Sequence, residues 1–223
     1  MSAVMKKFLE VGQSTTSPAE NTERKEIEVE VYVGENGYVQ NAGFTHQPIA
    51  ALEETAIQGP NAIVMHRTVS STASSALSSF KRGIGTHFLI DKDGTTYQTA
   101  SLKYHTSHIG PIRSRCFVEG TCPAEETKKI AKYGPKQGHD HEKNKAYPDR
   151  YPVNKDSVGI EVVAMYDEST RTWDEPTAAQ TESIKTLVRI LKNAYRLEDA
   201  DLYAHDTISR KTEGEGKGLY SGD

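Results

Sequence analysis

Two histidines and a group of acidic residues in this chain have the types and spacing of a metal site. His205 is followed within ten residues by one lysine and two glutamates, Lys211, Glu213 and Glu215. His66 ends the apolar run 62–65, at the point where a buried strand would emerge from a sheet. Two histidines and a carboxylate can hold Zn²⁺ with a water in the fourth position, which lowers the pKa of the water to ~7 and polarises a carbonyl. This donor set suits hydrolysis of an amide.

Alternating strand and helix patterns predict the elements that position these residues. Strands are expected where apolar residues alternate or form short β-branched runs, at residues 27–33, 61–65, 86–90, 95–99, 157–163 and 202–204. Glycine-containing turns at 34–37 and 91–94 favour hairpins, the first one leading into residues 38–39. Helices are expected at 71–80, with Gly83 near its end, and at 177–197, where Thr177 and Gln180 resemble a capping box. This order predicts an α/β fold with a central mixed sheet flanked by helices.

Length and pattern favour one domain with extensions. We expect a mobile arm over residues 1–24, an N-terminal extension with a β-hairpin over 25–60, and a catalytic domain over 61–223. Residues 116–155 look irregular and are too long for a structureless connection without a function, so they are interpreted as an insertion over one rim of the site.

Charge and hydropathy exclude several classes of protein. The formal net charge is −4, and the basic residues are scattered, so no nucleic-acid partner is expected. The longest apolar stretch falls far short of the ~18–20 residues that span a bilayer, and the first ten residues lack the apolar core of a signal peptide. A soluble protein without membrane insertion and without a Sec signal is expected.

The chain has two cysteines, Cys116 and Cys122, within a segment rich in loop residues. In an oxidising compartment they would form a short disulfide that closes a loop, whereas in the cytosol they would be free thiols. Zinc ligation by this pair is disfavoured, because no second pair of Cys or His lies at finger spacing.

An ordered set of motifs resembles a known enzyme family. The set comprises 63–66 (Ile-Val-Met-His), 85–94 (Gly-Thr-His-Phe-Leu-Ile-Asp-Lys-Asp-Gly), Tyr104-His105, 157–161 (Ser-Val-Gly-Ile-Glu), and His205 with 210–213 (Arg-Lys-Thr-Glu). It is similar to the zinc-dependent N-acetylmuramoyl-L-alanine amidases, whose superfamily includes peptidoglycan recognition proteins and amidase-type phage lysozymes. The resemblance runs from about residue 61 to 220 and leaves out 1–60 and 116–155. The insertion and the ending 211–216 also look similar to amidases delivered as antibacterial effectors, for example through type VI secretion.

The resemblance implies a fold, a cofactor and a reaction. The fold would be the mixed sheet of the amidases and peptidoglycan recognition proteins, with one Zn²⁺ held by His66, His205 and an acidic residue. The substrate would be peptidoglycan or a muropeptide, cleaved between the lactyl group of N-acetylmuramic acid and the L-Ala of the stem peptide. Glu161 matches the family's catalytic glutamate, which takes a proton from the zinc-bound water and passes it to the leaving amine. Lys211 would stabilise the oxyanion.

The third zinc ligand has two candidates. Spacing from Lys211 favours Glu213, whereas spacing from His205 favours Glu215, which is flanked by two glycines that allow close approach of the backbone. We expect Glu215, with Glu213 as the alternative. Four further residues are weighed around the site. His87 is expected to support a ligand without binding metal, Tyr104 and His105 are expected to contact substrate, and His108 is a weaker candidate for the same contact.

Other functions of the same residues stay open at this stage. A module that binds peptidoglycan without cleaving it is the main alternative, and a zinc hydrolase of another amide is a further one. The substrate that the resemblance implies would place the activity in the periplasm or cell wall. A secretion machine or lysis would then deliver the protein, and an effector would need an immunity protein in the producing cell.

Overall fold

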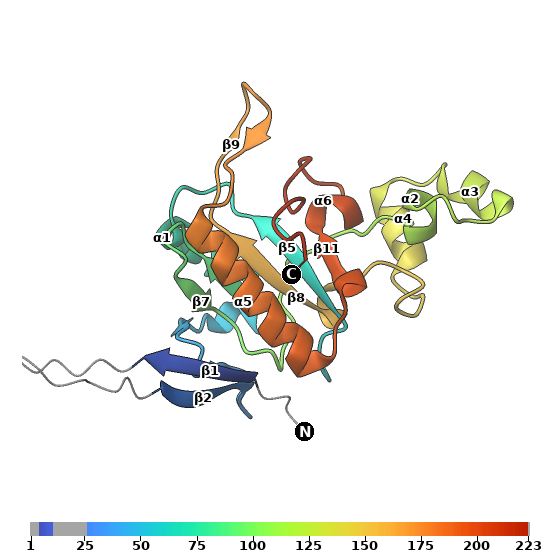
Figure 1. The fold of residues 1–223 in the computed structure, drawn as a ribbon. Helices are drawn as coiled ribbons and strands as arrows, with labels where there is room; N and C mark the ends of the chain where they lie inside the picture. Colours follow the sequence, from blue (N-terminus) through green and yellow to red (C-terminus); the bar gives the residue numbers. More distant parts are fainter. Residues whose placement is uncertain (1–4, 11–25, 223) are drawn as a thin grey trace, which may run out of the picture.

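The computed structural model describes residues 5–10 and 26–222. A six-stranded mixed sheet forms its centre, in the order β11-β5-β8-β6-β7-β4 (Figure 1). The bounds are Leu202–Ala204 for β11, Ala62–Arg67 for β5, Ser157–Val162 for β8, Phe88–Ile90 for β6, Thr96–Gln98 for β7 and Thr45–His46 for β4. The first four are parallel to one another, whereas β7 runs antiparallel to β6 and β4 runs parallel to β7. The predicted mixed sheet is confirmed.

One face of the sheet is covered by α5 (Ala178–Tyr195) (Figure 1). The Thr177 hydroxyl accepts a hydrogen bond from the Gln180 amide, and the Gln180 side chain accepts one from the Thr177 amide, so the predicted capping box starts this helix. The buried side of α5 presents Ile184, Leu187 and Leu191 to the sheet residues that face it. These sheet residues are Ile63 and Met65 of β5, Val158, Ile160 and Val162 of β8, and Phe88 and Ile90 of β6.

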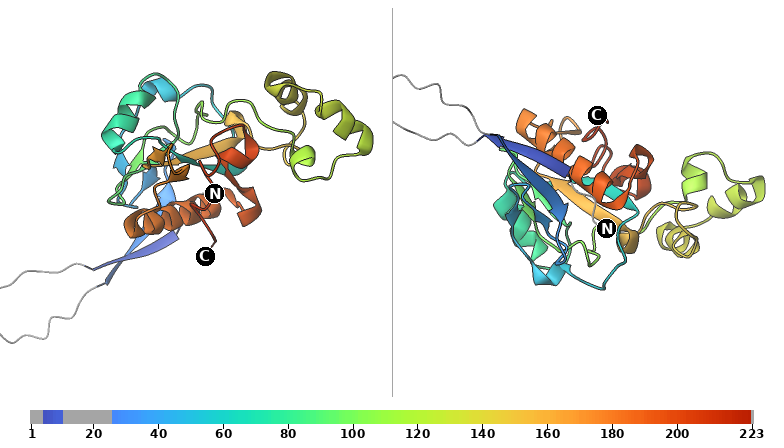
Figure 2. Two further views of the ribbon diagram at one scale, coloured as in Figure 1. Left: turned by 90° about the horizontal axis from the view of Figure 1, so that it is seen from above. Right: turned by 60° about the horizontal axis from the view of Figure 1, so that its bottom comes forward.

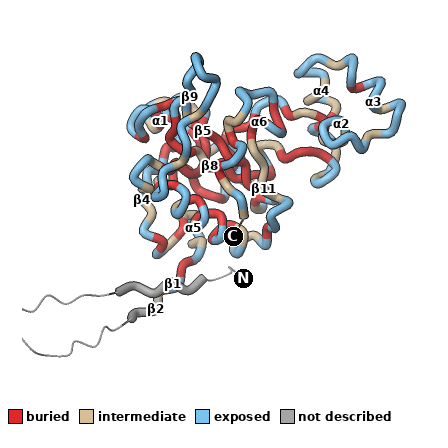
Figure 3. Tube along the Cα trace, turned by 45° about the horizontal axis from the view of Figure 1, so that its top comes forward, coloured by how far each residue is buried: buried red, intermediate tan, exposed pale blue. Residues whose placement is uncertain are grey.

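The opposite face of the sheet carries the polar residues of the site. Side chains alternate between the two faces of a strand, so His66 and Glu161 lie on the face away from α5. This second face is covered by α1 (Ala73–Phe80) near β6 and by the short helix α6 (His205–Ile208) near β5. Gly83 takes a positive φ of 84° after α1, as the predicted helix end requires. Figure 3 shows buried residues along β5 and β8.

A small antiparallel sheet lies at the N-terminal end, formed by β1 (Met5–Glu10), β2 (Glu26–Val33) and β3 (Val39–Gln40). The predicted β2–β3 hairpin is present, and Val31 and Val39 join the core beneath α5. Where the sequence favoured an arm, Met5–Glu10 instead form a strand paired with β2. The rest of that expected arm lies outside the described residues.

The insertion extends from the side of the main body (Figures 1 and 2). The prediction of irregular structure was wrong here, because the segment contains α2 (Arg115–Val118), α3 (Ala124–Ile130) and α4 (Pro135–Glu142). These helices are too short and too polar to show an apolar period in the sequence. Cys116 and Cys122 form a disulfide across the end of α2.

The remaining elements are short. They comprise the 3₁₀ turns Ala50–Leu52, Asn154–Asp156 and Asp199–Asp201 and the hairpin of β9 (Tyr166–Asp167) and β10 (Thr172–Trp173). Within the described residues, none of the helices has the length and apolar character needed to cross a bilayer.

Candidate metal centre

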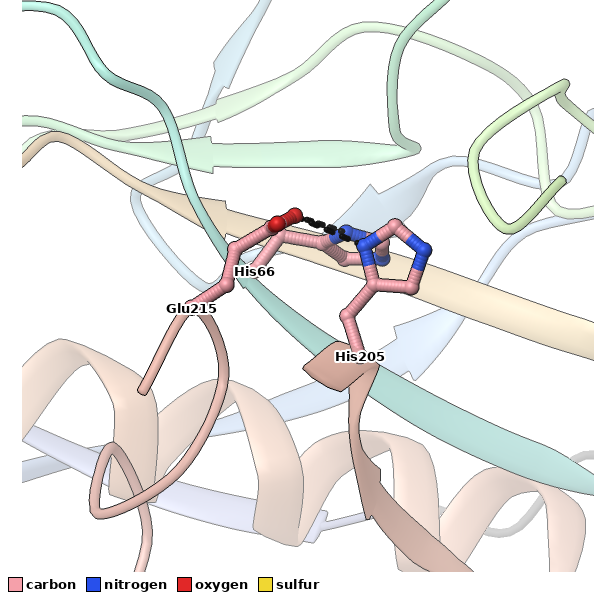
Figure 4. A group of neighbouring side chains, drawn as sticks. All are labelled: His66, His205 and Glu215. Atoms are coloured by element: carbon pink, nitrogen blue, oxygen red, sulfur yellow. Dashed lines mark hydrogen bonds and ion pairs between the residues drawn. The ribbon is translucent and has the colours of Figure 1, made fainter. Parts of the chain in front are cut away.

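Three side chains from distant parts of the sequence converge at the C-terminal end of β5. His66 lies in β5, His205 begins α6 directly after β11, and Glu215 lies in the loop that follows α6 (Figure 4). One potential ligand atom from each of them lies within 4.8 Å of those of the other two. Both histidines are buried, and Glu215 is partly buried. Parallel pairing of β11 with β5 brings the two imidazoles together, with ring centroids 4.2 Å apart.

The hydrogen bonds of His205 assign its tautomer. Its Nε2 lies 2.8 Å from the carbonyl oxygen of Ile109, which can only accept, so Nε2 carries the proton. In the neutral ring the lone pair is then on Nδ1, which lies 2.7 Å from Oε1 of Glu215. Two electron-rich atoms at this separation repel each other unless a cation, either a proton or a metal ion, lies with them. The geometry of His205 therefore calls for a positive charge at this point.

A chain of three side chains assigns the tautomer of His66 in the same way. The Ser157 hydroxyl donates to the carbonyl oxygen of Val153, so its oxygen accepts Nε2–H of His108. The Nδ1 of His108 is then an acceptor, and His66 donates Nε2–H to it over 3.0 Å. This leaves the lone pair of His66 on Nδ1, which lies 3.8 Å from Oε1 of Glu215. Both imidazoles thus direct Nδ1 lone pairs towards one carboxylate.

Burial sets the charge states of this group. Burial, and then the neighbouring His205, lower the pKa of His66 to about 3. Burial acts first to lower the pKa of His108 well below its usual value. For Glu215, burial acts to raise the pKa, but its contacts with His205 and His66 outweigh this effect and lower the pKa to about 2. At neutral pH His66 is neutral and Glu215 is ionised, which is the state that a metal ion needs in its ligands.

The loop that carries Glu215 is fixed by residues next to the two histidines in sequence. Asp206 accepts hydrogen bonds from the backbone amides of Gly214, Gly216 and Lys217. Arg67 donates to the carbonyl oxygens of Gly214 and Lys217 from the other side. A Cβ on Gly216 would lie 2.2 Å from the carbonyl oxygen of Met65, so only glycine allows the loop to lie this close to β5.

Two further polar residues surround the group. Glu161 in β8 is the register partner of His66 in β5, and its Oε2 lies 3.5 Å from the Thr86 hydroxyl. Burial, and then the charge of Glu215, raise the pKa of Glu161 to about 7. Lys211 lies near enough to lower the pKa of both Glu161 and His66 by its charge. A carboxyl group that titrates near neutrality can act both as a base and as an acid.

The other residues weighed from the sequence lie farther from the group. The buried His87 bonds to the backbone, with Nε2 on the Tyr104 carbonyl and Nδ1 on the Gly159 amide. Burial lowers the pKa of His87 to about 4. The ring of His105 contacts Thr55 and Glu54, 3.0 and 3.1 Å away. The histidine that contacts His66 is not His105 but His108, which lies three residues after it.

Glu213 is exposed and is not part of the converging group. Its carbonyl oxygen accepts a hydrogen bond from the indole N–H of Trp173 in the β9–β10 hairpin. Sequence reasoning left out Arg67 and Asp206, and it did not connect His108 with His66. The positions of Arg67 and Asp206 in the sequence could have indicated them, because Arg67 directly follows His66 and Asp206 directly follows His205.

A second group with ligand-type atoms within 4.8 Å of one another lies in the insertion, formed by Glu126, His141 and Glu142. There the Nζ of Lys145 lies 2.7 Å from Glu142 and 3.7 Å from Glu126. Lys145 therefore already pairs with both of these carboxylates, whereas Glu215 has no lysine or arginine at ion-pair distance among the described residues.

Comparison with known proteins places the chain in a family and a fold. A family model described as N-acetylmuramoyl-L-alanine amidase matches residues 56–216, whereas no curated protein matches the chain. The crystal structure of a selenomethionine derivative of AmpD is similar with a TM-score of 0.55 and 15% identity, over 84% of this chain and 93% of that one. An endolysin described as an N-acetylmuramoyl-L-alanine amidase from Clostridium intestinale has 19% identity over 75% of this chain and 84% of its own, with a TM-score of 0.45. The likeness to AmpD shows a shared fold.

The family match covers most of the chain and includes His66, Glu161, His205 and Glu215. This chain therefore belongs to the N-acetylmuramoyl-L-alanine amidase family.

Proposed function

We propose that this chain is a zinc-dependent peptidoglycan hydrolase that cleaves the amide between N-acetylmuramic acid and the L-Ala of the stem peptide. The observation that carries the proposal is the convergence of two Nδ1 lone pairs and one carboxylate beside the partly buried Glu161. Family membership supplies the reaction class, and the site supplies the groups that the reaction needs.

The donor set fits Zn²⁺. Two neutral imidazoles and one carboxylate are common ligands of catalytic zinc, and they leave a fourth position open. His66, His205 and Glu215 would hold the ion, and when bound it would supply a water of lowered pKa and polarisation of the lactyl carbonyl. Glu213 has no place in this group, and its side chain is exposed.

Glu161 and Lys211 supply the remaining chemistry in this proposal. Glu161 accepts a proton from the attacking water and delivers it to the amine nitrogen as the C–N bond breaks. The products are a lactyl carboxylate on the sugar and a stem peptide with a free amino group. The fixed charge of Lys211 stabilises the negative oxygen that forms on the lactyl carbon. A metal ion held by His66, His205 and Glu215 would lower the pKa of Glu161 and favour its ionised form.

His108 acts as a positioning residue in this scheme. Its acceptor Nδ1 holds His66 in the tautomer whose Nδ1 faces Glu215. The Cβ of an alanine at Gly159 would lie 2.8 Å from Nδ1 of His108, so the glycine leaves the space that this ring needs. Substrate contact by Tyr104 and His105 stays a prediction.

We also propose that the chain works on the cell wall outside the inner membrane. The Cys116–Cys122 disulfide supports this location, because such bonds persist in oxidising compartments. Action as an antibacterial effector, with an immunity protein in the producing cell, extends the proposal and is supported only by the resemblance of the insertion and of residues 211–216 to such enzymes.

Product analysis tests the proposed reaction. Zinc-loaded protein incubated with purified muropeptides should release the intact stem peptide with a free L-Ala amino terminus, seen by mass spectrometry. Binding of muropeptides without cleavage would instead indicate a recognition module, and cleavage of another amide would indicate a different zinc hydrolase. Either result would refute the proposal.

A further inference from the structure

Two neighbouring cavities lie between His108 and the insertion, and Lys211 lines both of them. The first, of about 590 Å³, is lined by Ser107, His108, Ile109 and Lys211 among others. The second, of about 790 Å³, lies between residues 112–114, Arg210, Lys211 and the helices of the insertion, and we call it the insertion pocket. Both cavities share four lining residues, Ile112, Pro135, Arg210 and Lys211. Since Lys211 lines both cavities, a ligand that contacts Lys211 can extend into the insertion pocket.

The insertion pocket combines apolar walls with positive charge. Its apolar lining includes Phe117, Val118 and Ile130, of which Phe117 and Val118 are 44% and 41% exposed. Its charged lining consists of three cations, Arg113, Arg210 and Lys211, and includes no carboxylate. None of the three cations forms an ion pair with a carboxylate in the described part of the chain. In a protein of net charge −4, this is a local site for an anionic ligand that also has apolar groups.

The wall of the pocket is held in place by the rest of the fold. The disulfide closes the loop that carries Phe117 and Val118. Arg115 in α2 donates to the carbonyl oxygen of Pro148 over 2.8 Å, and its guanidinium lies 5.9 Å from the ring of Tyr151. The amide of Ile112 donates to His139 in α4. These contacts give the pocket a fixed shape, as expected of a preformed binding site.

We propose that the insertion pocket binds the carboxylate-bearing distal part of the stem peptide, beyond the L-Ala residue released by cleavage. This inference rests on the proposed function, which places the scissile amide beside Glu161 and Lys211. The charge decides which side of the substrate enters the pocket, because the distal peptide carries carboxylates whereas a neutral N-acetylated sugar carries none. Arg113 and Arg210 pair with the carboxylates, and Phe117 and Val118 contact the alkyl groups.

Two substrates of different length test the proposal. One is a muropeptide with the full acidic stem, and the other is an N-acetylmuramoyl dipeptide too short to reach the pocket. Arg113→Gln should raise KM about tenfold for the long substrate, as loss of one charge-assisted contact implies, and should leave both parameters for the short one unchanged. Phe117→Ser should act in the same direction. Lys128→Gln is the matched control, because Lys128 is an exposed cation of α3 that pairs with Glu125 and does not line the pocket.

A binding measurement separates this inference from the proposed function. Free acidic stem peptide and its carboxamide form are titrated into the Glu161→Gln protein by calorimetry. The acid form should bind more tightly than the carboxamide form, and Arg113→Gln should remove the difference, even if no cleavage occurs in any assay. Equal binding of both forms, or equal effects of Arg113→Gln on long and short substrates, would overturn the proposal.

Discussion

Replacing His108 with leucine should weaken zinc binding although His108 is not itself a ligand in this scheme. The change removes the acceptor for Nε2–H of His66. In the metal-free variant the ring proton of His66 can move from Nε2 to Nδ1, where it faces Glu215. Zinc must then displace this proton in order to bind Nδ1. An unsatisfied buried donor costs about 1–3 kcal/mol. With ~1.4 kcal/mol for each factor of ten, this corresponds to a loss of about 5- to 150-fold in zinc affinity.

A competition titration against a chromophoric zinc chelator measures this loss. His108→Gln should retain most of the affinity, because its amide oxygen can accept from His66 while its N–H₂ donates to Ser157. His105→Leu is the control, since His105 is equally buried but contacts Glu54 and Thr55 rather than His66. Thermal unfolding of each metal-free variant shows whether it folds. The reasoning would be refuted if His108→Leu bound zinc as tightly as the unaltered protein, or if glutamine gave no rescue.

Four further predictions concern the same site and the insertion. Glu215→Ala should abolish stoichiometric zinc binding, measured by metal analysis after dialysis, whereas the Glu213→Ala protein should still bind one zinc ion. The reverse result would identify Glu213 as the third ligand. Glu161→Gln should lower kcat by about 10²–10⁴ while zinc content stays at one ion per chain, and loss of zinc would show that Glu161 is a ligand instead. Because the base must be ionised and its pKa is raised to about 7 without metal, kcat/KM should fall as pH decreases through a value at or below 7; a rate that rises towards acid pH would contradict this role. Replacing Cys116 and Cys122 together by serine should raise KM for the full-stem muropeptide several-fold but not for the short substrate. Equal changes in KM for both substrates would show that the disulfide does not act through the insertion pocket.

The strands and the main helix could be predicted from the sequence because their signals are local. Period-two alternation located β2, and a short apolar run located β5. The Thr177 cap located the start of α5. The face of the sheet that carries His66 and Glu161 also follows from alternation, once both strands are placed side by side. The short strands β4, β9 and β10 were not predicted, because two residues carry no period.

Choices among neighbouring polar residues required the three-dimensional structure. Glu213 and Glu215 differ by two positions, and the structure brings Glu215 to the histidines because Asp206 and Arg67 hold the loop at Gly214 and Lys217. His105 and His108 lie in one short run with similar surroundings in sequence. Only the fold shows that the loop turns His108 towards His66 and His105 towards Glu54. Such contacts depend on long-range packing, which leaves no local pattern in the sequence.

Anomalous diffraction at the zinc edge, from crystals of the zinc-loaded protein, tests the central claim most directly. The account predicts one strong peak within about 2.0–2.2 Å of Nδ1 of His66, Nδ1 of His205 and a carboxylate oxygen of Glu215. A peak at Nε2 of either histidine, a peak only at Glu126 and His141 in the insertion, or no peak at β5 would contradict it.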